Sequence, residues 1–194
     1  MKRLFLSVVI SVITLISFAQ TDSKHITFKG IPIDGTLTSF VSKMKAAGFT
    51  EAGLFDGIAA LKGDFASYKN CTVLVSMIKA TNKVNTVAVM FPEYDQWSQL
   101  ENNYKYLKTM LTEKYGEPTD CVEEFQDKLP PTDDSQKIYS LKFDRCTYYT
   151  TFKTSKGDIQ LSLFQQDRTE CFVKLQYWDK INTDAVHAKA IDDL

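Results

Sequence analysis

The chain has 194 residues, of which 44% are apolar and 24% charged, and its 23 basic residues nearly balance its 24 acidic ones. This composition is typical of a globular protein and excludes a fibrous chain and a disordered acidic one. The balanced charge leaves no surplus basic field, so we expect no nucleic-acid partner. Composition by itself indicates no activity.

The first segment has the pattern of a secretory signal. Lys2 and Arg3 precede an apolar run from Leu4 to Phe18, and Ala19 follows it. The run is shorter than the roughly 20 residues that cross a membrane, and no later stretch is long enough to do so. We therefore expect residues 1–19 to be a signal peptide. Residues 20–194 would then form one exported domain, periplasmic or extracellular, with no transmembrane segment.

The predicted elements begin with a helix over residues 36–47, where apolar side chains recur at helical spacing. Thr36 is expected to cap its start, and Gly48 followed by Phe49 to end it. Three strands are expected next, at 60–66, 71–78 and 84–91. Pro92 is expected to end the third, because proline has no N–H to donate to a sheet.

A second helix is predicted over residues 96–115, with Asp95 as its cap and Gly116 and Pro118 at its end. The polar stretch after Cys121, up to Ser135, is expected to be a loop. Later strands are predicted at 138–143, 146–153, 158–165 and 171–178, followed by a weakly helical tail over 183–194.

The two halves of the chain repeat one order of elements. Residues 26–92 and 95–179 each contain a helix, a glycine stop and antiparallel strands, and Cys71-Thr72 and Cys146-Thr147 open equivalent strands. The expected fold class is α+β. It consists of two similar units, each a helix packed on an antiparallel β-meander, joined into one continuous sheet.

Several segments carry a resemblance: the opening ITFKGIPIDGTLTSFVSKMKAAGF, the strand KNCTV, the helix end LTEKYGEP and the closing LQYWDKIN. With the export signal, they resemble small exported proteins of unassigned function from Gram-negative gut bacteria. The order of elements is similar to the tandem-repeat β-lactamase inhibitory protein fold, in which two such units form one long sheet. The resemblance implies an architecture and carries no activity with it.

The four cysteines, Cys71, Cys121, Cys146 and Cys171, form an even set in an exported chain. Such a set permits disulfides in any of three pairings, and the alternative is that some are free and buried. None of their spacings is that of a metal-ligand pair, so we expect no metal site.

Catalytic motifs are missing from the sequence. It contains no nucleophile elbow, zinc-protease, phosphate-loop or dinucleotide pattern. The two histidines, His25 and His187, lie near the chain ends, where mobility is common, and adjacent acids such as Asp133 and Asp134 are typical of solvated surface. We expect no enzyme, no catalytic residues and no cofactor.

The alternation of the strands predicts a sheet with two different faces. One face is apolar, with Cys71, Val73, Val75, Met77, Val87, Val89, Phe91, Cys146, Tyr148, Phe152, Ile159, Leu161, Leu163, Cys171, Val173, Leu175 and Tyr177. The opposite face mixes polar and large apolar groups: Thr72, Ser76, Thr86, Thr147, Thr151, Gln160, Ser162, Lys174, Gln176, Leu74, Ile78, Met90, Tyr149, Phe164, Phe172 and Trp178. A solvated face would be mostly polar, so this mixture indicates a binding surface.

The functional prediction is a non-catalytic binding or inhibitory module, with Tyr149, Phe164, Phe172 and Trp178 as anchors for a protein or another envelope macromolecule. A loop, the C-terminal tail or a second copy of the chain is the alternative cover for this face. The alternative functions are a structural or assembly role in the cell envelope and, with less support, a hydrolase. The sequence names neither the partner nor the oligomeric state.

Overall fold

The computed structural model describes residues 23–192, so the predicted signal peptide over residues 1–19 lies outside the described residues. The helices are α1 (Leu37–Ala46), α2 (Trp97–Tyr115), α3 (Asp134–Lys142) and α4 (Lys180–Asp192). The strands are β1 (Thr27–Phe28), β2 (Ile31–Pro32), β3 (Thr50–Phe55), β4 (Ile58–Phe65), β5 (Tyr68–Ile78), β6 (Lys83–Glu93), β7 (Asp120–Phe125), β8 (Cys146–Lys153), β9 (Gly157–Gln166) and β10 (Glu170–Asp179).

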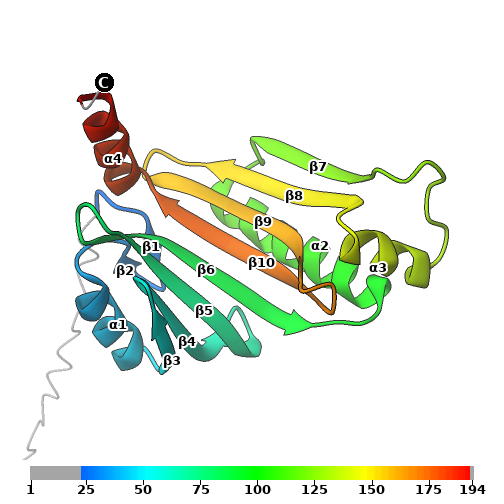
Figure 1. The fold of residues 1–194 in the computed structure, drawn as a ribbon, viewed down its shortest axis with the longest axis horizontal. Helices are drawn as coiled ribbons and strands as arrows, with labels where there is room; N and C mark the ends of the chain where they lie inside the picture. Colours follow the sequence, from blue (N-terminus) through cyan, green and yellow to red (C-terminus); the bar gives the residue numbers. More distant parts are fainter. Residues whose placement is uncertain (1–22, 193–194) are drawn as a thin grey trace, which may run out of the picture.

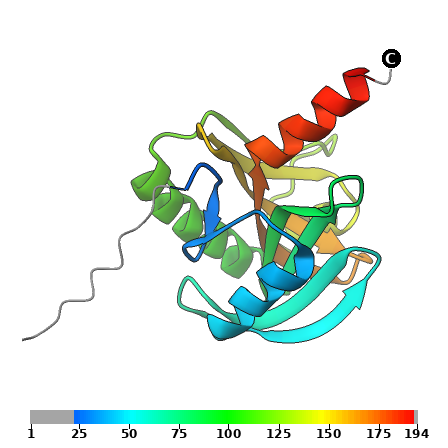
Figure 2. The same ribbon diagram turned by 90° about the vertical axis from the view of Figure 1, so that its left-hand side faces the viewer.

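An antiparallel sheet of eight strands dominates the fold, in the order β3-β4-β5-β6-β10-β9-β8-β7 (Figure 1). β6 and β10 pair in its middle, with Val89 opposite Leu175 and Val87 opposite Tyr177. The small β1–β2 ribbon forms a second sheet. The class is therefore α+β, as predicted. Helix α2 lies behind the sheet in the view of Figure 1, and α4 extends away from the end of β10 (Figures 1 and 2).

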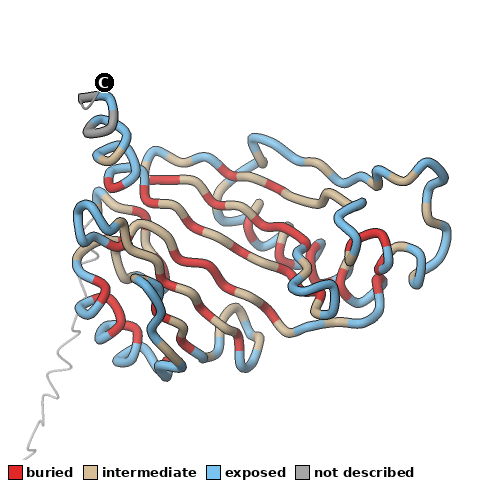
Figure 3. The backbone as a smooth tube through the Cα atoms, in the orientation of Figure 1, coloured by how far each residue is buried: buried red, intermediate tan, exposed pale blue. Residues whose placement is uncertain are grey.

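The hydrophobic core lies between the helices and one face of the sheet. Buried and partly exposed residues alternate along the central strands (Figure 3). The predicted apolar face is the inner one, and Val73, Val89 and Leu175 are among its fully buried members. The helices contribute apolar residues at helical spacing, such as Phe40 and Met44 of α1. Within residues 23–192, no helix combines the length and apolar character that a membrane crossing needs.

The first helix follows its sequence signals closely. The Thr36 hydroxyl accepts a hydrogen bond of 3.3 Å from the Ser39 N–H, which satisfies one of the free donors at the helix start. At the other end Gly48 has a φ of 94°, and the Phe49 N–H donates to the Met44 carbonyl at 3.1 Å. This closing geometry is the glycine stop that the sequence predicted.

Two elements of the second half differ from the predictions. The strand predicted at 138–143 is wrong, because this segment belongs to α3, whose first turn is capped by a 2.8 Å bond from the Gln136 N–H to Asp133. The loop predicted from Cys121 to Ser135 is also wrong in part, since it contains β7 and the start of α3. β7 is an edge strand with few apolar side chains, so it lacks the alternation of a half-buried strand.

Two predicted boundaries also need correction. β6 continues through Pro92 to Glu93, because the pairing with β10 shifts register next to Phe172, and a bulge tolerates a residue without an N–H. Asp95 does not cap α2. The capping residue is Gln96, without a side-chain bond, and Asp134 of α3 instead accepts a 3.0 Å bond from the Ser98 N–H.

The segment around His25 is tied to the far end of the chain. His25 Nδ1 lies 3.0 Å from the fully buried Asp179 carboxylate, which also accepts the Ile26 N–H at 3.2 Å and the Asn182 N–H at 2.9 Å. The Asn182 side-chain amide donates to Asp34 Oδ1 and to the carbonyls of Ile33 and Val84. His25 is therefore part of a buried network that joins β1, β6 and α4.

All four cysteines are free thiols in the structure, so the possible disulfide is not formed there. Cys71 and Cys171 are buried, and burial raises the pKa of both thiols. Burial likewise raises the pKa of Cys146 to about 12. Cys121 is exposed. The alternative that some cysteines act as small core residues is the one that fits this structure.

These environments predict one fast thiol. A thiol reacts as its thiolate, so Cys121 should react with maleimide at pH 8 at least about tenfold faster than Cys71, Cys146 or Cys171. Replacing Cys121 with Ser should remove the fast phase. In denaturant without reductant all four thiols should titrate, and a count below four would show that the native protein carries a disulfide.

The network around Asn182 predicts a large stability effect. Asn182→Ala removes the side-chain amide that donates to the Ile33 and Val84 carbonyls, so we expect the free energy of unfolding to fall by about 2 kcal/mol. Asn102→Ala, at an exposed position on α2, is the matched control and should change stability by less than about 0.5 kcal/mol. Urea unfolding measures both, and equal effects would contradict a structural role for the network.

Candidate functional site

The candidate site is the sheet surface that faces away from the core, which we call the open face. Its residues on the five central strands are Thr72, Leu74 and Ser76 of β5, Thr86, Ala88 and Met90 of β6, Phe172, Lys174, Gln176 and Trp178 of β10, Asp158, Gln160, Ser162 and Phe164 of β9, and Thr147, Tyr149 and Thr151 of β8. Helices α1–α3 bury their apolar residues in the core instead. The strand side chains that the sequence placed on the mixed face therefore share one surface.

The strand register arranges the open face in rows. One row runs through Leu74, Ala88, Gln176, Gln160 and Thr151. The next runs through Thr72, Met90, Lys174, Ser162 and Tyr149. Gln160 donates to the Thr151 hydroxyl at 3.2 Å, so these two polar side chains are hydrogen-bonded to each other within the face. The middle of the face is thus polar or small, with larger groups around it.

Phe164 and Phe172 lie side by side at one end of the face. They are opposite one another in the β9–β10 pairing, and their ring centroids are 5.6 Å apart. Phe164 is 40% exposed, as an anchor should be, whereas Phe172 is only 2% exposed. The prediction of Phe172 as an exposed anchor is wrong. It lies beside the β-bulge and against Phe164, so it supports that ring rather than meeting solvent.

Tyr149 lies on β8, opposite Ser162 in the β8–β9 pairing. Its hydroxyl donates to Asp120 of β7 at 2.9 Å, and this hydrogen bond raises the pKa of Tyr149. The ring is half-buried and its hydroxyl is held by the neighbouring strand. The side chain is therefore fixed in position on the face before any partner arrives.

Trp178 is half-buried at the opposite end of β10, between Thr86 and Asp158 in the cross-strand pairing. Six residues separate it from Phe172, which corresponds to about 20 Å along a strand. The structure therefore brings Phe164 and Phe172 together, with Tyr149 diagonally next to Phe164 on the neighbouring strand β8, and places Trp178 at the far end of β10. A ligand that touches all of the exposed anchors must be as large as a protein surface.

The open face extends further than the sequence prediction. Phe55 and Ile58 flank the β3–β4 turn, pair with each other, and are 70% and 40% exposed. Asp56 and Gly57 form this turn with φ values of 42° and 83°. An Asp-Gly pair between apolar residues is a strong hairpin signal, so the sequence contained the information that would have found β3 and these two residues.

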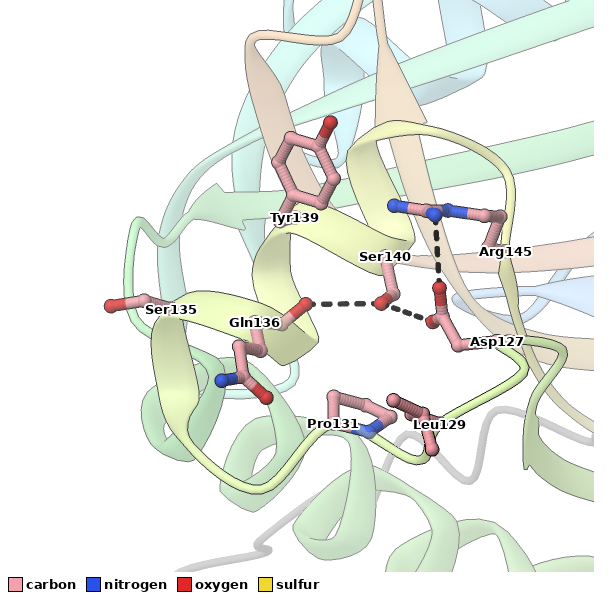
Figure 4. A pocket seen from close by; sticks show the side chains of 8 residues that line it. All are labelled: Asp127, Leu129, Pro131, Ser135, Gln136, Tyr139, Ser140 and Arg145. Atoms are coloured by element: carbon pink, nitrogen blue, oxygen red, sulfur yellow. Dashed lines mark hydrogen bonds and ion pairs between the residues drawn. The ribbon is translucent and has the colours of Figure 1, made fainter.

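A separate cleft of about 380 Å³ lies between α3 and the preceding loop (Figure 4). Ser140 donates to the Asp127 carboxylate, and its hydroxyl also lies 3.0 Å from the Gln136 carbonyl. Arg145 pairs with the same carboxylate at 3.1 Å. Leu129, on the rim of the cleft, is 84% exposed.

This cleft has few of the groups that hydrolysis needs. No histidine lines it, and the Asp127 carboxylate is engaged by Arg145 and so is poorly placed to act as a general base for Ser140. His25 lies elsewhere, with both ring nitrogens facing carboxylates, at 3.0 Å from Asp179 and 3.6 Å from Asp34. Over residues 23–192 no three histidine, cysteine or carboxylate side chains are arranged so that they could hold a metal ion. The Ser140–Asp127 hydrogen bond and the Arg145–Asp127 ion pair hold the loop on α3.

Comparison with known protein families, with curated proteins and with solved structures finds no match for this chain.

The bonds in the cleft predict a local effect on the loop. Asp127→Ala removes the partner of both Ser140 and Arg145, so trypsin should cut after the exposed Lys128 several times faster, and stability should fall by about 2 kcal/mol. Glu117→Gln, an exposed position outside the cleft, should leave the cleavage rate unchanged. An unaltered rate in the Asp127→Ala variant would mean that the cleft does not hold the loop.

Proposed function

We propose that the chain is an exported, non-catalytic binding or inhibitory module that holds a protein partner on its open face. The observation that carries this proposal is the unequal packing of the two sheet faces. Helices bury the inner face, whereas the open face keeps Phe164 40% exposed and Trp178 and Tyr149 half-buried. Large apolar groups left on a defined surface are typical of recognition sites.

The composition of the open face supports a protein partner. Protein interfaces combine a few aromatic anchors with polar groups that are already hydrogen-bonded, as Tyr149 and Gln160 are here. The eight strands span about 34 Å across and the anchors about 20 Å along them. This is the scale of the roughly 800 Å² that each partner contributes to a stable interface.

We also propose that residues 26–92 and 95–179 are two related units. The order of elements supports this: α1 precedes the meander β3–β6, and α2 precedes β7–β10, with α3 inserted between β7 and β8. The last strands of the two units, β6 and β10, pair at the centre of the sheet. The resemblance to the β-lactamase inhibitory protein fold implies this arrangement and carries no activity with it. Export is proposed from the signal pattern of residues 1–19.

An envelope assembly role is the second candidate, because the same face would serve a permanent complex as well as an inhibitor. A stable complex recovered from membrane fractions would favour it. A hydrolase has less support, since Ser140 in the α3 cleft has no histidine beside it and its hydroxyl donates to an ion-paired carboxylate.

The proposal predicts a specific loss of binding. In the double variant Tyr149→Ser and Trp178→Ser, both anchors lose their rings, so partner capture from the native envelope should fall at least about tenfold. The control is Tyr106→Ser with Met110→Ser, which removes two large side chains, 53% and 36% exposed, from α2 on the other side of the sheet. Its capture should be unchanged. The measurement is site-specific crosslinking and affinity capture, quantified by mass spectrometry.

Circular dichroism and urea unfolding accompany the capture assay. The double variant should keep its fold, whereas Phe172→Ser should lower stability because that ring is buried. If the double variant unfolds, Tyr149 and Trp178 belong to the core. If it folds and still captures the partner at the original level, the open face is not the binding surface.

A further inference from the structure

Lys174 is a partly buried cation of the open face without a counterion, whereas Lys62 of β4, opposite Thr72, and Lys153 of β8, opposite Asp158, are exposed cations of the same face. Lys174 lies on β10, opposite Met90 of β6 and Ser162 of β9. Its ammonium is 4.1 Å from the centroid of the Phe164 ring, a favourable cation–π contact. Among the described residues no carboxylate lies within ion-pair distance of this ammonium, and burial alone lowers the pKa of Lys174.

The surroundings of Lys174 are free of acidic groups over several strands. On the outer side of β10, Lys174 lies between Phe172 and Gln176. Across the sheet, its row continues past Met90 to Thr72 and past Ser162 to Tyr149. Glu93 pairs with Phe172 at the end of β6 but is exposed and makes no ion pair with Lys174. The acid opposite Trp178 is Asp158 of β9, which lies four positions along that strand from Ser162, the residue opposite Lys174.

Several other lysines are paired with acids. Lys79 pairs with Asp56 at 2.7 Å, and Lys83 pairs with Asp34 at 3.1 Å. For Lys108, burial acts to lower the pKa, but hydrogen bonds to Glu123 and Cys121 raise it. Within residues 23–192, Lys174 is the lysine whose pKa is lowered, with burial as its cause. Burying an ammonium is costly unless an opposite charge balances it.

We infer that the partner places an aspartate or glutamate carboxylate on Lys174, carried by a protein loop whose neighbouring side chains are apolar. This inference rests on the proposed function and names the chemistry that the same face recognises. Met90 on one side and Phe164 on the other supply apolar contacts for the residues next to the acid. The Ser162 hydroxyl, opposite Lys174, offers a donor to the second carboxylate oxygen.

A protein loop fits this site better than a polyanion does. Phosphate chains are held by several cations in sequence, because affinity grows with each neutralised charge. Here Met90, Phe164 and Phe172 flank Lys174, and the next cation of its row, Lys62, lies three strands away on β4. One carboxylate with apolar neighbours matches that arrangement of one charge among apolar surfaces.

The test selects ligands without knowledge of the natural partner. A library of disulfide-constrained loops displayed on phage is selected against the purified protein, and loops are kept that fail to bind the Tyr149→Ser and Trp178→Ser variant. These loops should be enriched in Asp or Glu next to apolar residues. For a selected loop, Lys174→Met should weaken binding by about tenfold to a hundredfold, and added salt should weaken binding to the parent protein.

Matched substitutions distinguish the effect of the Lys174 charge from an effect on folding. Lys174→Arg should retain most of the affinity, and Lys153→Met, an exposed lysine of β8, should retain all of it. Changing the acid of the loop to its amide should weaken binding to the parent protein as much as Lys174→Met does, and the two changes together should add little. The loop change requires no protein variant, so it stays informative if Lys174→Met fails to fold.

The outcomes distinguish this inference from the proposed function. Loops that need Tyr149 and Trp178 but contain no acid and ignore Lys174→Met would overturn the carboxylate assignment and leave the binding face intact. If no selected loop depends on Tyr149 and Trp178, both the binding face and the carboxylate assignment fail. Acidic loops whose binding is equally weakened by Lys153→Met would also overturn it, because general attraction to positive charge would explain them.

Discussion

The pairing of β6 with β10 is the interaction on which the rest of the structure depends. It joins residues 83–93 to residues 170–179, which are distant in the sequence, and converts two meanders into one sheet. On the inner side the pair brings Val87 and Val89 against Tyr177 and Leu175, all buried. Without this pairing each meander would present an open central edge and would bury its apolar face only against the helices of its own half.

The same pairing creates the open face. Because side chains alternate along a strand, fixing the buried set on the inner side fixes the outward set as well. Met90, Lys174 and Ser162 therefore lie in one row as a consequence of the packing of Val89, Leu175 and Leu161 beneath them. A partner can use this row without disturbing the core, because the inner side chains are already packed by the helices. The proposal thus places partner binding on one face of the sheet, while the packing that stabilises the fold lies on the other.

The sequence predicted those parts of the fold that carry strong periodic signals. Alternation in residues 71–78 and 171–178 and helical spacing in residues 36–47 correspond to buried surfaces, so these elements were assigned correctly. The edge strand β7 and the short helix α3 were missed because their burial is slight and their apolar residues few. Both depend on the neighbours β8 and α2.

The sequence predicted that the sheet has an open face of mixed composition, but it did not predict the exposure of each residue on that face. Because side chains alternate along β10, the sequence places Phe172 and Trp178 on the same outer side. Phe172 is nevertheless buried, because a bulge and the Phe164 ring enclose it. The alternation also does not predict which charged side chains surround Lys174, because this depends on which strands become neighbours. Likewise His25 and Asp179 meet only because the ends of the chain pack together, a contact that no local pattern encodes.

The central claim is that a partner covers the open face, and hydroxyl-radical footprinting tests it most directly. The oxidation rates of Met90, Tyr149 and Trp178 are compared between the protein alone and the protein in its native envelope, with the exposed Tyr106 of α2 as the internal reference. The account predicts that all three are protected in the envelope while Tyr106 reacts at the same rate. Protection of Tyr106 with unchanged rates at Met90, Tyr149 and Trp178 would contradict it.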